Sequence, residues 1–473
     1  MSLVIHTIKK EVRMKKFVVF ALALFLVLPA ISYAGSATSR YDVTITGYVG
    51  IDFGWVDQLQ GGDAAVGLRD NAYGTTWRHN KSNFFSSAGN TQLGFLVKGP
   101  DGWGAKTSAY IEGDFRGITG TPRANQGIGP AGATGYSGAG VNTTGGTFSL
   151  RHAFMKFDWP GTSLTIGQTW QLFSLMPYSY GGVMLTYWGI AADMKGTRQP
   201  TIRIRQELPA GFSTTIGIIS PYETIGAATN STGVDAFSAS NTPWTEFELA
   251  YNTKALGTIG PFGAQIAFDA MLGKARYIYT NPGNTGYSSQ TTQAWGAAVK
   301  GYVPIIAAKG QSKANTLAMS GNLFTGQNMG WYMGPLFHGS WDRDQATTLQ
   351  DYGTPVVTGG FASLSYYITD KVFVTGWWGQ MRYAYSEAYR SAAWANAYGA
   401  LHANNFQYMG YQILNLSYDV NPAIRLGAEV ARIKTAWAGF VTAAGGMPAA
   451  GGTNVGGRQG HVDHFRVGAW YFF

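Results

Sequence analysis

The sequence predicts an all-β fold, a closed antiparallel β-barrel that spans a membrane, and three observations support this class. The chain ends on an alternating strand whose last residue, Phe473, is aromatic. Segments of alternating apolar and polar residues recur along the chain, and a tilted membrane strand needs only about 9 to 11 residues. Short and long connections alternate between these segments, which is typical of barrels that carry turns at one end and loops at the other.

The last nine residues form a strand with two different faces. One face is apolar at period two, whereas the opposite face begins with Arg466 and Gly468. The apolar face consists of Phe465, Val467, Ala469, Tyr471 and Phe473. This ending also resembles the C-terminal signal by which bacterial outer-membrane barrels are recognised for insertion. The edge strand of a soluble sheet has the same pattern over nine residues, so the rest of the chain decides between the two.

The N-terminus has the features of a cleaved export signal. Lys15 and Lys16 precede an unbroken apolar run over 17–28, and small residues lead to a cleavage site after Ala34. We therefore predict a signal peptide over 1–34, with Met14 as the working start. The run is shorter than the roughly 20 apolar residues of a membrane helix, and no later segment is long enough either. The mature chain, 35–473, is predicted to be a single barrel domain.

The composition excludes several classes of function. The chain has no cysteine, which excludes a disulfide framework, a thiolate metal site and haem attachment through paired cysteines. Only 12% of the residues are charged, because apolar and small polar residues alternate where a soluble protein would have a charged surface. Lysine and arginine do not cluster with aromatic residues, so we expect no nucleic-acid partner.

A long strand with two faces opens the mature chain, because apolar residues occupy the odd positions over 41–55. Similar alternation returns many times. Seven short and eight long connections imply sixteen strands, with both termini at the periplasmic end that carries the short turns. The fifth short connection, near 304–314, is long for a hairpin turn, so a barrel of 18 strands stays open. The long connections are expected over 56–90, 117–146, 171–199, 221–242, 273–291, 326–354, 382–404 and 437–460.

Two carboxylates share one face of the predicted strand that contains residues 108–115. Glu112 and Asp114 alternate with Ile111 and Phe115, so we expect both carboxylates in the lumen. An enzyme would use such a pair as general acid and base, but no histidine or nucleophile can be placed beside them. A solvated channel wall is therefore the favoured interpretation, and we expect no catalytic residue in the chain.

Three arginines are also expected to point into the lumen. Arg151 shares a face with Met155 and Phe157 at period two, and Arg203 and Arg205 alternate with isoleucines. An arginine that faced lipid near the midplane would cost about 2 to 4 kcal/mol, whereas a lumenal arginine stays hydrated. Two roles stay open for them: pairing with carboxylates such as Glu112 and Asp114, and ion selectivity.

The long connection over 171–199 is predicted to fold into the lumen as a constriction loop. It is less rich in glycine and serine than the other long connections, and its apolar residues need a place to be buried. Its aromatic residues include Tyr178, Tyr180, Tyr187 and Trp188. The alternative is an outer loop that packs over the rim or against a neighbouring subunit.

Three segments, 109–115, 150–154 and 164–168, resemble successive strands of bacterial outer-membrane porins. The long connection that follows them matches the third loop of that family. The resemblance implies a 16-stranded barrel, usually one of three in a trimer, whose third loop folds inwards and faces basic wall residues. It offers Asp193 as the acid of that loop, opposite the three arginines. This loop departs from the family in having one acidic residue and many aromatic ones, which argues against a strong transverse field.

The predicted function is passive diffusion of small hydrophilic solutes and ions through the outer membrane of a Gram-negative bacterium, with at most a modest anion bias. Two alternatives stay open. One is a substrate-selective channel, in which the loop aromatics stack on a sugar or an aromatic solute. The other is a surface structural or adhesion protein that the barrel merely anchors.

The expected partners follow from this location. They are outer-membrane lipid and lipopolysaccharide, the barrel-assembly machinery during insertion, two further copies in a homotrimer, and the permeating solutes. We expect no cofactor. We also expect no metal site, because His461 and His464, the two histidines that lie close in sequence, point to opposite faces of a strand.

Overall fold

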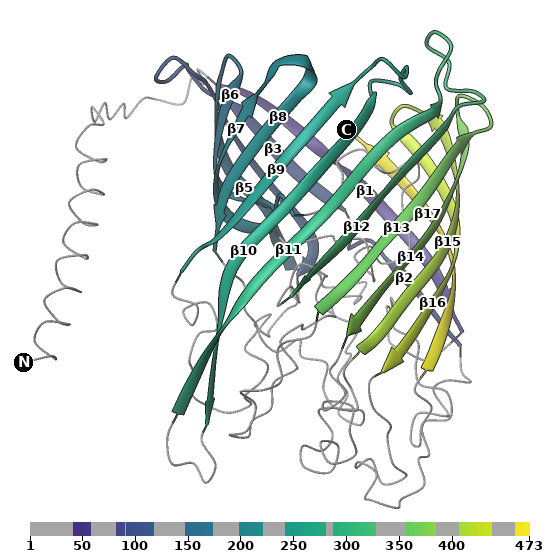
Figure 1. Ribbon diagram of the computed structural model, residues 1–473. Helices are drawn as coiled ribbons and strands as arrows, with labels where there is room; N and C mark the ends of the chain where they lie inside the picture. The colour runs from purple at the N-terminus through teal and green to yellow at the C-terminus, as the bar shows by residue number, and fades with distance from the viewer. Residues whose placement is uncertain are drawn as a thin grey trace, which may run out of the picture. The chain divides into compact units, whose positions relative to one another are not determined.

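The structure is a computed structural model, and its strands lie between Asp42 and Phe472. It describes residues 41–57, 82–89, 91–117, 147–173, 198–220, 242–280, 287–327, 356–384, 406–437 and 459–473. The predicted signal peptide lies outside these residues. All the described strands belong to one antiparallel sheet, and the sheet closes on itself because the last strand pairs with the first (Figure 1).

The strands follow one another in chain order around the wall. They are β1 (Asp42–Val56), β2 (Asn83–Ser87), β3 (Gln92–Lys98), β4 (Lys106–Gly117), β5 (Thr147–Trp159), β6 (Thr162–Trp170), β7 (Arg198–Glu207), β8 (Phe212–Ile219), β9 (Trp244–Thr253), β10 (Ala264–Thr280), β11 (Tyr287–Ile306), β12 (Leu317–Gln327), β13 (Val356–Tyr367), β14 (Val372–Ala384), β15 (Phe406–Asn421), β16 (Ile424–Trp437) and β17 (Gln459–Phe472). Residues Pro209–Gly211 form a short 3-10 turn between β7 and β8.

The wall contains 16 crossings, although the sheet has 17 strands. Strands β2 and β3 both pair with the same edge of β1: β2 lies beside 52–56 and β3 lies beside 42–48. They are two halves of one interrupted crossing. The prediction of 16 strands is therefore confirmed, and the alternative of 18 is wrong.

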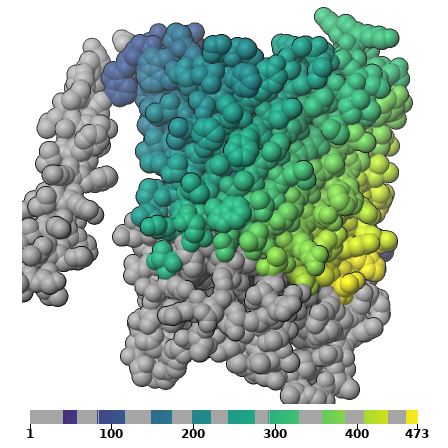
Figure 2. Space-filling view, in the orientation of Figure 1, coloured from purple at the N-terminus to yellow at the C-terminus, as the bar shows by residue number. Residues whose placement is uncertain are grey.

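The two faces of the wall differ in chemistry, as the period-two pattern predicts. On β1, Val43, Val49 and Phe53 are exposed and face outwards, whereas Asp52 on the other face is 2% exposed. Exposed leucine, isoleucine, valine and aromatic side chains lie in the same way on the outward face of most other strands. Figure 2 shows one side of this outer surface. An outward apolar face on a closed sheet, which leaves no unpaired edge, is what a bilayer requires of a strand-built span.

One predicted face assignment is wrong, and a β-bulge explains the error. The pairing of β4 with β5 shifts register between Glu112/His152 and Gly113/Leu150, so Arg151 is an extra residue in β5. Arg151 and His152 are both buried, whereas Leu150 and Met155 are exposed on the outward face. Arg151 and Met155 therefore lie on different faces of β5, because a bulge interrupts the alternation of faces.

No helix among the described residues has both the length and the apolar character needed to cross a membrane.

Candidate functional site

The inward face of β4 and β5 carries a closed ion-pair cluster. Arg151 Nε donates to Glu112 Oε1 at 2.6 Å, and its Nη1 donates to Asp114 Oδ2 at 2.8 Å. The hydroxyl of Tyr110 donates to the second oxygen of Glu112 at 2.6 Å. The side chains of Arg151 and Asp114 are 7% and 6% exposed. The structure thus brings together three residues that the sequence singled out, and Arg151 is paired with two carboxylates.

The bulge in β5 adds a histidine to this cluster. Because Arg151 is the extra residue, His152 points inwards beside it rather than outwards. The ring of His152 lies within hydrogen-bonding distance of Thr169 Oγ1, at 3.1 Å, and its Nε2 is 3.9 Å from Glu112 Oε1. Sequence reasoning missed His152, because a bulge leaves no clear mark in the residue pattern.

Arg203 and Arg205 lie on β7, on the face opposite the exposed Ile202 and Ile204. Arg203 Nη1 donates to the carbonyl oxygen of Trp170 at 3.0 Å. Within the described residues, neither arginine forms an ion pair. These two guanidinium groups therefore lie on the inner wall without a described carboxylate at ion-pair distance, in contrast to Arg151.

A second charged cluster, which sequence reasoning missed, lies on the inward face of β9, β10 and β11. Lys300 Nζ is 2.9 Å from Glu248 Oε2 and 2.9 Å from Asp269 Oδ2. The lysine side chain is 4% exposed and Asp269 is fully buried. The signal was present, because Glu246 and Glu248 alternate with apolar residues as Glu112 and Asp114 do, so the same rule would have found them.

This second cluster holds the start of the connection that follows β6. The backbone N–H groups of Leu172 and Phe173 donate to the two carboxylate oxygens of Glu246, at 3.0 and 3.3 Å. The carbonyl oxygen of Leu172 accepts a hydrogen bond from Lys300 Nζ at 2.9 Å. Phe173 is fully buried. Glu246 lies three strands beyond β6 and Lys300 lies five strands beyond it, so residues 171–173 run inwards from β6 and lie against the inner wall.

The remaining residues predicted for the constriction lie outside the described part of the chain. They are Asp193, Tyr178, Tyr180, Tyr187 and Trp188. Of the connection over 171–199, the structure describes 171–173 and 198–199.

The C-terminal strand has the predicted two faces. Phe465, Val467, Tyr471 and Phe473 are exposed on the outward face, and Ala469 is half-buried between them. Arg466 is 1% exposed on the inward face, where its Nη1 lies 3.6 Å from Asp52 Oδ2 of β1. A buried charge pair therefore lies at the seam that closes the barrel.

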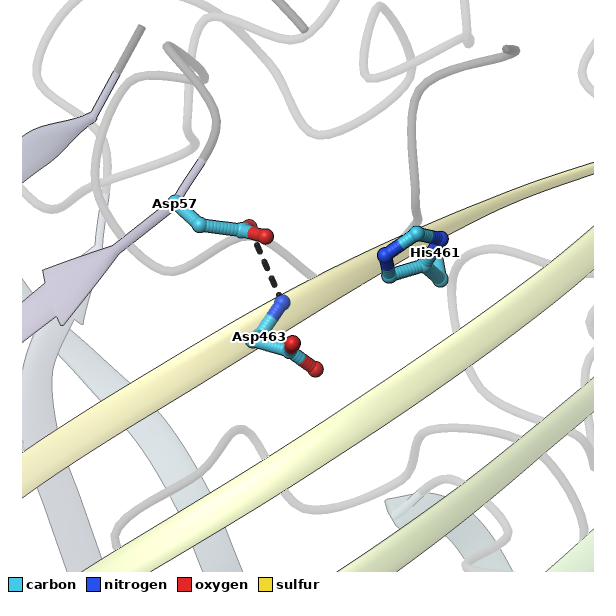
Figure 3. Close-up of side chains that lie close together, drawn as sticks. All are labelled: Asp57, His461 and Asp463. Carbon is cyan, nitrogen blue, oxygen red and sulfur yellow. Dashed lines mark hydrogen bonds between the residues drawn. The ribbon is translucent and has the colours of Figure 1, made fainter. Parts of the chain in front are cut away.

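A cluster that could hold a cation lies further along this seam, just beyond the pair Val56 and His464. Potential ligand atoms of Asp57, His461 and Asp463 all lie within 4.8 Å of one another (Figure 3). Arg432 already donates to both oxygens of Asp463, at 2.7 and 2.6 Å, and the Asp463 N–H donates to Asp57 Oδ1 at 2.9 Å. This guanidinium group neutralises Asp463 and competes with a cation, so we interpret the cluster as part of the seam.

Comparison with known proteins identifies the fold. No family model and no curated protein matches the sequence. The outer membrane channel DcaP of Acinetobacter baumannii has a similar structure, with 17% identity over 93% of this chain and 99% of that chain, at a TM-score of 0.59. OprB of Pseudomonas putida is similar at 10% identity over 92% of this chain and 94% of that chain, at a TM-score of 0.52.

The 16 crossings form a closed antiparallel β-barrel with an apolar outer face and a charged inner face. Its fold is that of the outer-membrane porins.

Proposed function

We propose that this protein is a water-filled channel of the outer membrane of a Gram-negative bacterium, through which small hydrophilic solutes and ions diffuse passively. The observation that carries the proposal is the contact of Leu172 and Phe173 with Glu246 and Lys300. A chain that enters the barrel directly after β6 and is fixed to the inner wall narrows the lumen. The 171–199 connection then acts as the constriction loop.

The inner wall gives this channel a modest preference for anions. Arg203 and Arg205 have no described carboxylate at ion-pair distance, whereas Arg151 and Lys300 are each paired with two carboxylates. Wall charges act on a passing ion over about 8 to 10 Å at ordinary salt. Asp193 and the four loop aromatics complete the constriction in this proposal, and no step of it involves catalysis.

The same proposal includes the partners that the sequence predicts. The exposed apolar side chains of the C-terminal strand contact lipid and form the signal read by the barrel-assembly machinery, after removal of residues 1–34. The outward wall meets phospholipid and lipopolysaccharide, and three copies assemble into a homotrimer. The apolar outer face supports a membrane location, because a lysine or arginine that faced lipid at the midplane would cost about 2 to 4 kcal/mol.

Planar-bilayer recording tests this function. Purified protein added to one chamber should produce stepwise increases of current in potassium chloride. Stable barrels that insert without any conductance step would contradict the channel and would favour a barrel that serves only as an anchor.

A further inference from the structure

Four turns at the short-turn end of the barrel are joined to one another, and we call them the turn platform. They are residues 254–263, 307–316, 368–371 and 419–425. The Ala308 N–H donates to the Thr258 carbonyl at 2.8 Å, which joins the first turn to the second. The Asp419 N–H donates to the Lys371 carbonyl at 2.8 Å, which joins the third to the fourth. Figure 1 shows this end of the barrel at the top, where the C-terminus also lies.

Asp370 joins the second turn to the third. Its Oδ1 accepts hydrogen bonds from the Ser312 hydroxyl at 2.9 Å, from the Lys313 N–H at 2.6 Å and from the Ala314 N–H at 3.2 Å. A hairpin needs only about two to five residues, so two ten-residue turns that are ordered by such contacts exceed what the connection requires. The extra length that the sequence shows at 304–314 therefore builds a defined structure.

The platform folds towards the inside of the barrel mouth. Ile259 of the first turn is 3% exposed, because it packs with Tyr302 and Ala318, and Tyr367 lies against this group. Tyr302 is on the same face of β11 as Lys300, which contacts Leu172 inside the barrel. The first turn thus covers inward-facing residues and borders the opening through which solutes pass.

The platform is strongly basic. Its cations are Lys254, Lys309, Lys313, Lys371 and Arg425, and its carboxylates are Asp370 and Asp419. Arg425 pairs with Asp419, with Nη2 to Oδ2 at 2.9 Å, and Asp370 is occupied by its three donors. Four lysines are therefore left without a carboxylate partner among the platform residues, and those at 254, 309 and 371 are exposed.

We infer that the turn platform is an anion-collecting vestibule at the periplasmic mouth, which selects small anionic solutes before or after they pass the constriction. The inference rests on the proposed channel function and adds a second selectivity element at one end of the pore. Several like charges held at the rim of a narrow opening concentrate ions of opposite sign there. The hydrogen bonds between the turns matter, because turns without them would let the lysines move away from the opening.

Reversal potentials across a salt gradient test the vestibule. The variant Lys254→Gln/Lys309→Gln/Lys371→Gln removes three platform charges and leaves the hydrogen bonds of Asp370 in place. At about 0.1 M potassium chloride, where charges act over about 10 Å, we expect its chloride-to-potassium permeability ratio to fall about threefold. At about 1 M salt, where the range falls to about 3 Å, the difference from the unmodified protein should nearly vanish.

The matched control removes the same charge from exposed positions on the outward face, outside the platform, in the variant Lys274→Gln/Arg382→Gln/Lys434→Gln. Its permeability ratio should stay close to that of the unmodified protein. An unchanged ratio in the platform variant, or an equal fall in the control, would overturn the vestibule while conductance persists. Absence of any conductance in the unmodified protein would instead contradict the proposed function. Failure of the vestibule and failure of the channel are therefore distinguishable.

Discussion

Lys300 Nζ donates a hydrogen bond to the carbonyl oxygen of Leu172 at 2.9 Å, so a lysine of β11 holds the backbone that has just left β6. Two carboxylates, Glu248 and Asp269, hold the same ammonium group at 2.9 Å each. A single buried side chain therefore links three neighbouring wall strands to the start of the inward connection. We interpret Lys300 as a positioning residue for the constriction.

Substitution Lys300→Met should destabilise the barrel and release the start of the inward connection. Removal of one partner of a buried ion pair costs about 3 to 5 kcal/mol, because it leaves the other charges uncompensated. We expect a lower urea midpoint and noisier single-channel current, and Lys300→Arg should restore much of both. Lys274→Met, at an exposed lysine of β10, is the control. If Lys300→Met keeps the normal urea midpoint and the normal current noise, Lys300 does not position the inward connection.

The sequence predicted the barrel well because closure and lipid exposure impose a simple rule on every strand. The alternation over 41–55 and over 465–473 places apolar residues outwards, and the structure has the same faces. The count of short and long connections led to 16 crossings, even though the second crossing is split into β2 and β3. The split lies inside a predicted long connection, 56–90, and left the count unchanged.

The charged wall was only partly predictable. Glu112 and Asp114 follow the alternation rule, and the same rule applies to Glu246, Glu248 and Lys300, which we had not singled out. The wrong face for Met155 and the missed His152 have one cause: a bulge changes which residues face inwards, and cross-strand register rather than residue type reveals it. Contacts such as Lys300 with Leu172 join residues 128 positions apart and cannot be derived from local pattern.

Substitution Arg151→Met should be strongly destabilising, because it leaves Glu112 and Asp114 close together without their shared cation. We expect a loss of about 3 to 5 kcal/mol in the free energy of unfolding. The triple variant Arg151→Met/Glu112→Gln/Asp114→Asn should recover most of that loss, since it removes the uncompensated charges as well. Urea unfolding in detergent micelles measures both. A triple variant no more stable than the single one would indicate that Arg151 acts through packing instead.

Substitution Arg205→Gln should reduce the anion preference without affecting stability. A unit charge about 8 Å from a passing ion in water changes its energy by about 0.5 kcal/mol, which corresponds to about a twofold change in permeability ratio. Reversal potentials at about 0.1 M salt measure that ratio. Arg382→Gln, on the outward face of β14, should leave it unchanged. A preference that survives the loss of Arg205 and Arg203 together would require another source of selectivity.

Substitution Asp370→Ala should loosen the second turn of the platform. The Ser312 hydroxyl and the backbone N–H groups of Lys313 and Ala314 stabilise the carboxylate and hold the pKa of Asp370 below its ordinary value of 3.8. A lowered pKa in the folded protein means that this contribution is present above the ordinary value and is lost as pH falls through the lower one. Hydrogen exchange of peptides over 307–316 should show protection falling about two- to tenfold in Asp370→Ala at neutral pH. Asp370→Asn, which keeps an accepting oxygen, should lose less. The unmodified protein should keep its protection down to about pH 4, and a loss of protection near pH 6 would show that a group other than Asp370 braces the turn.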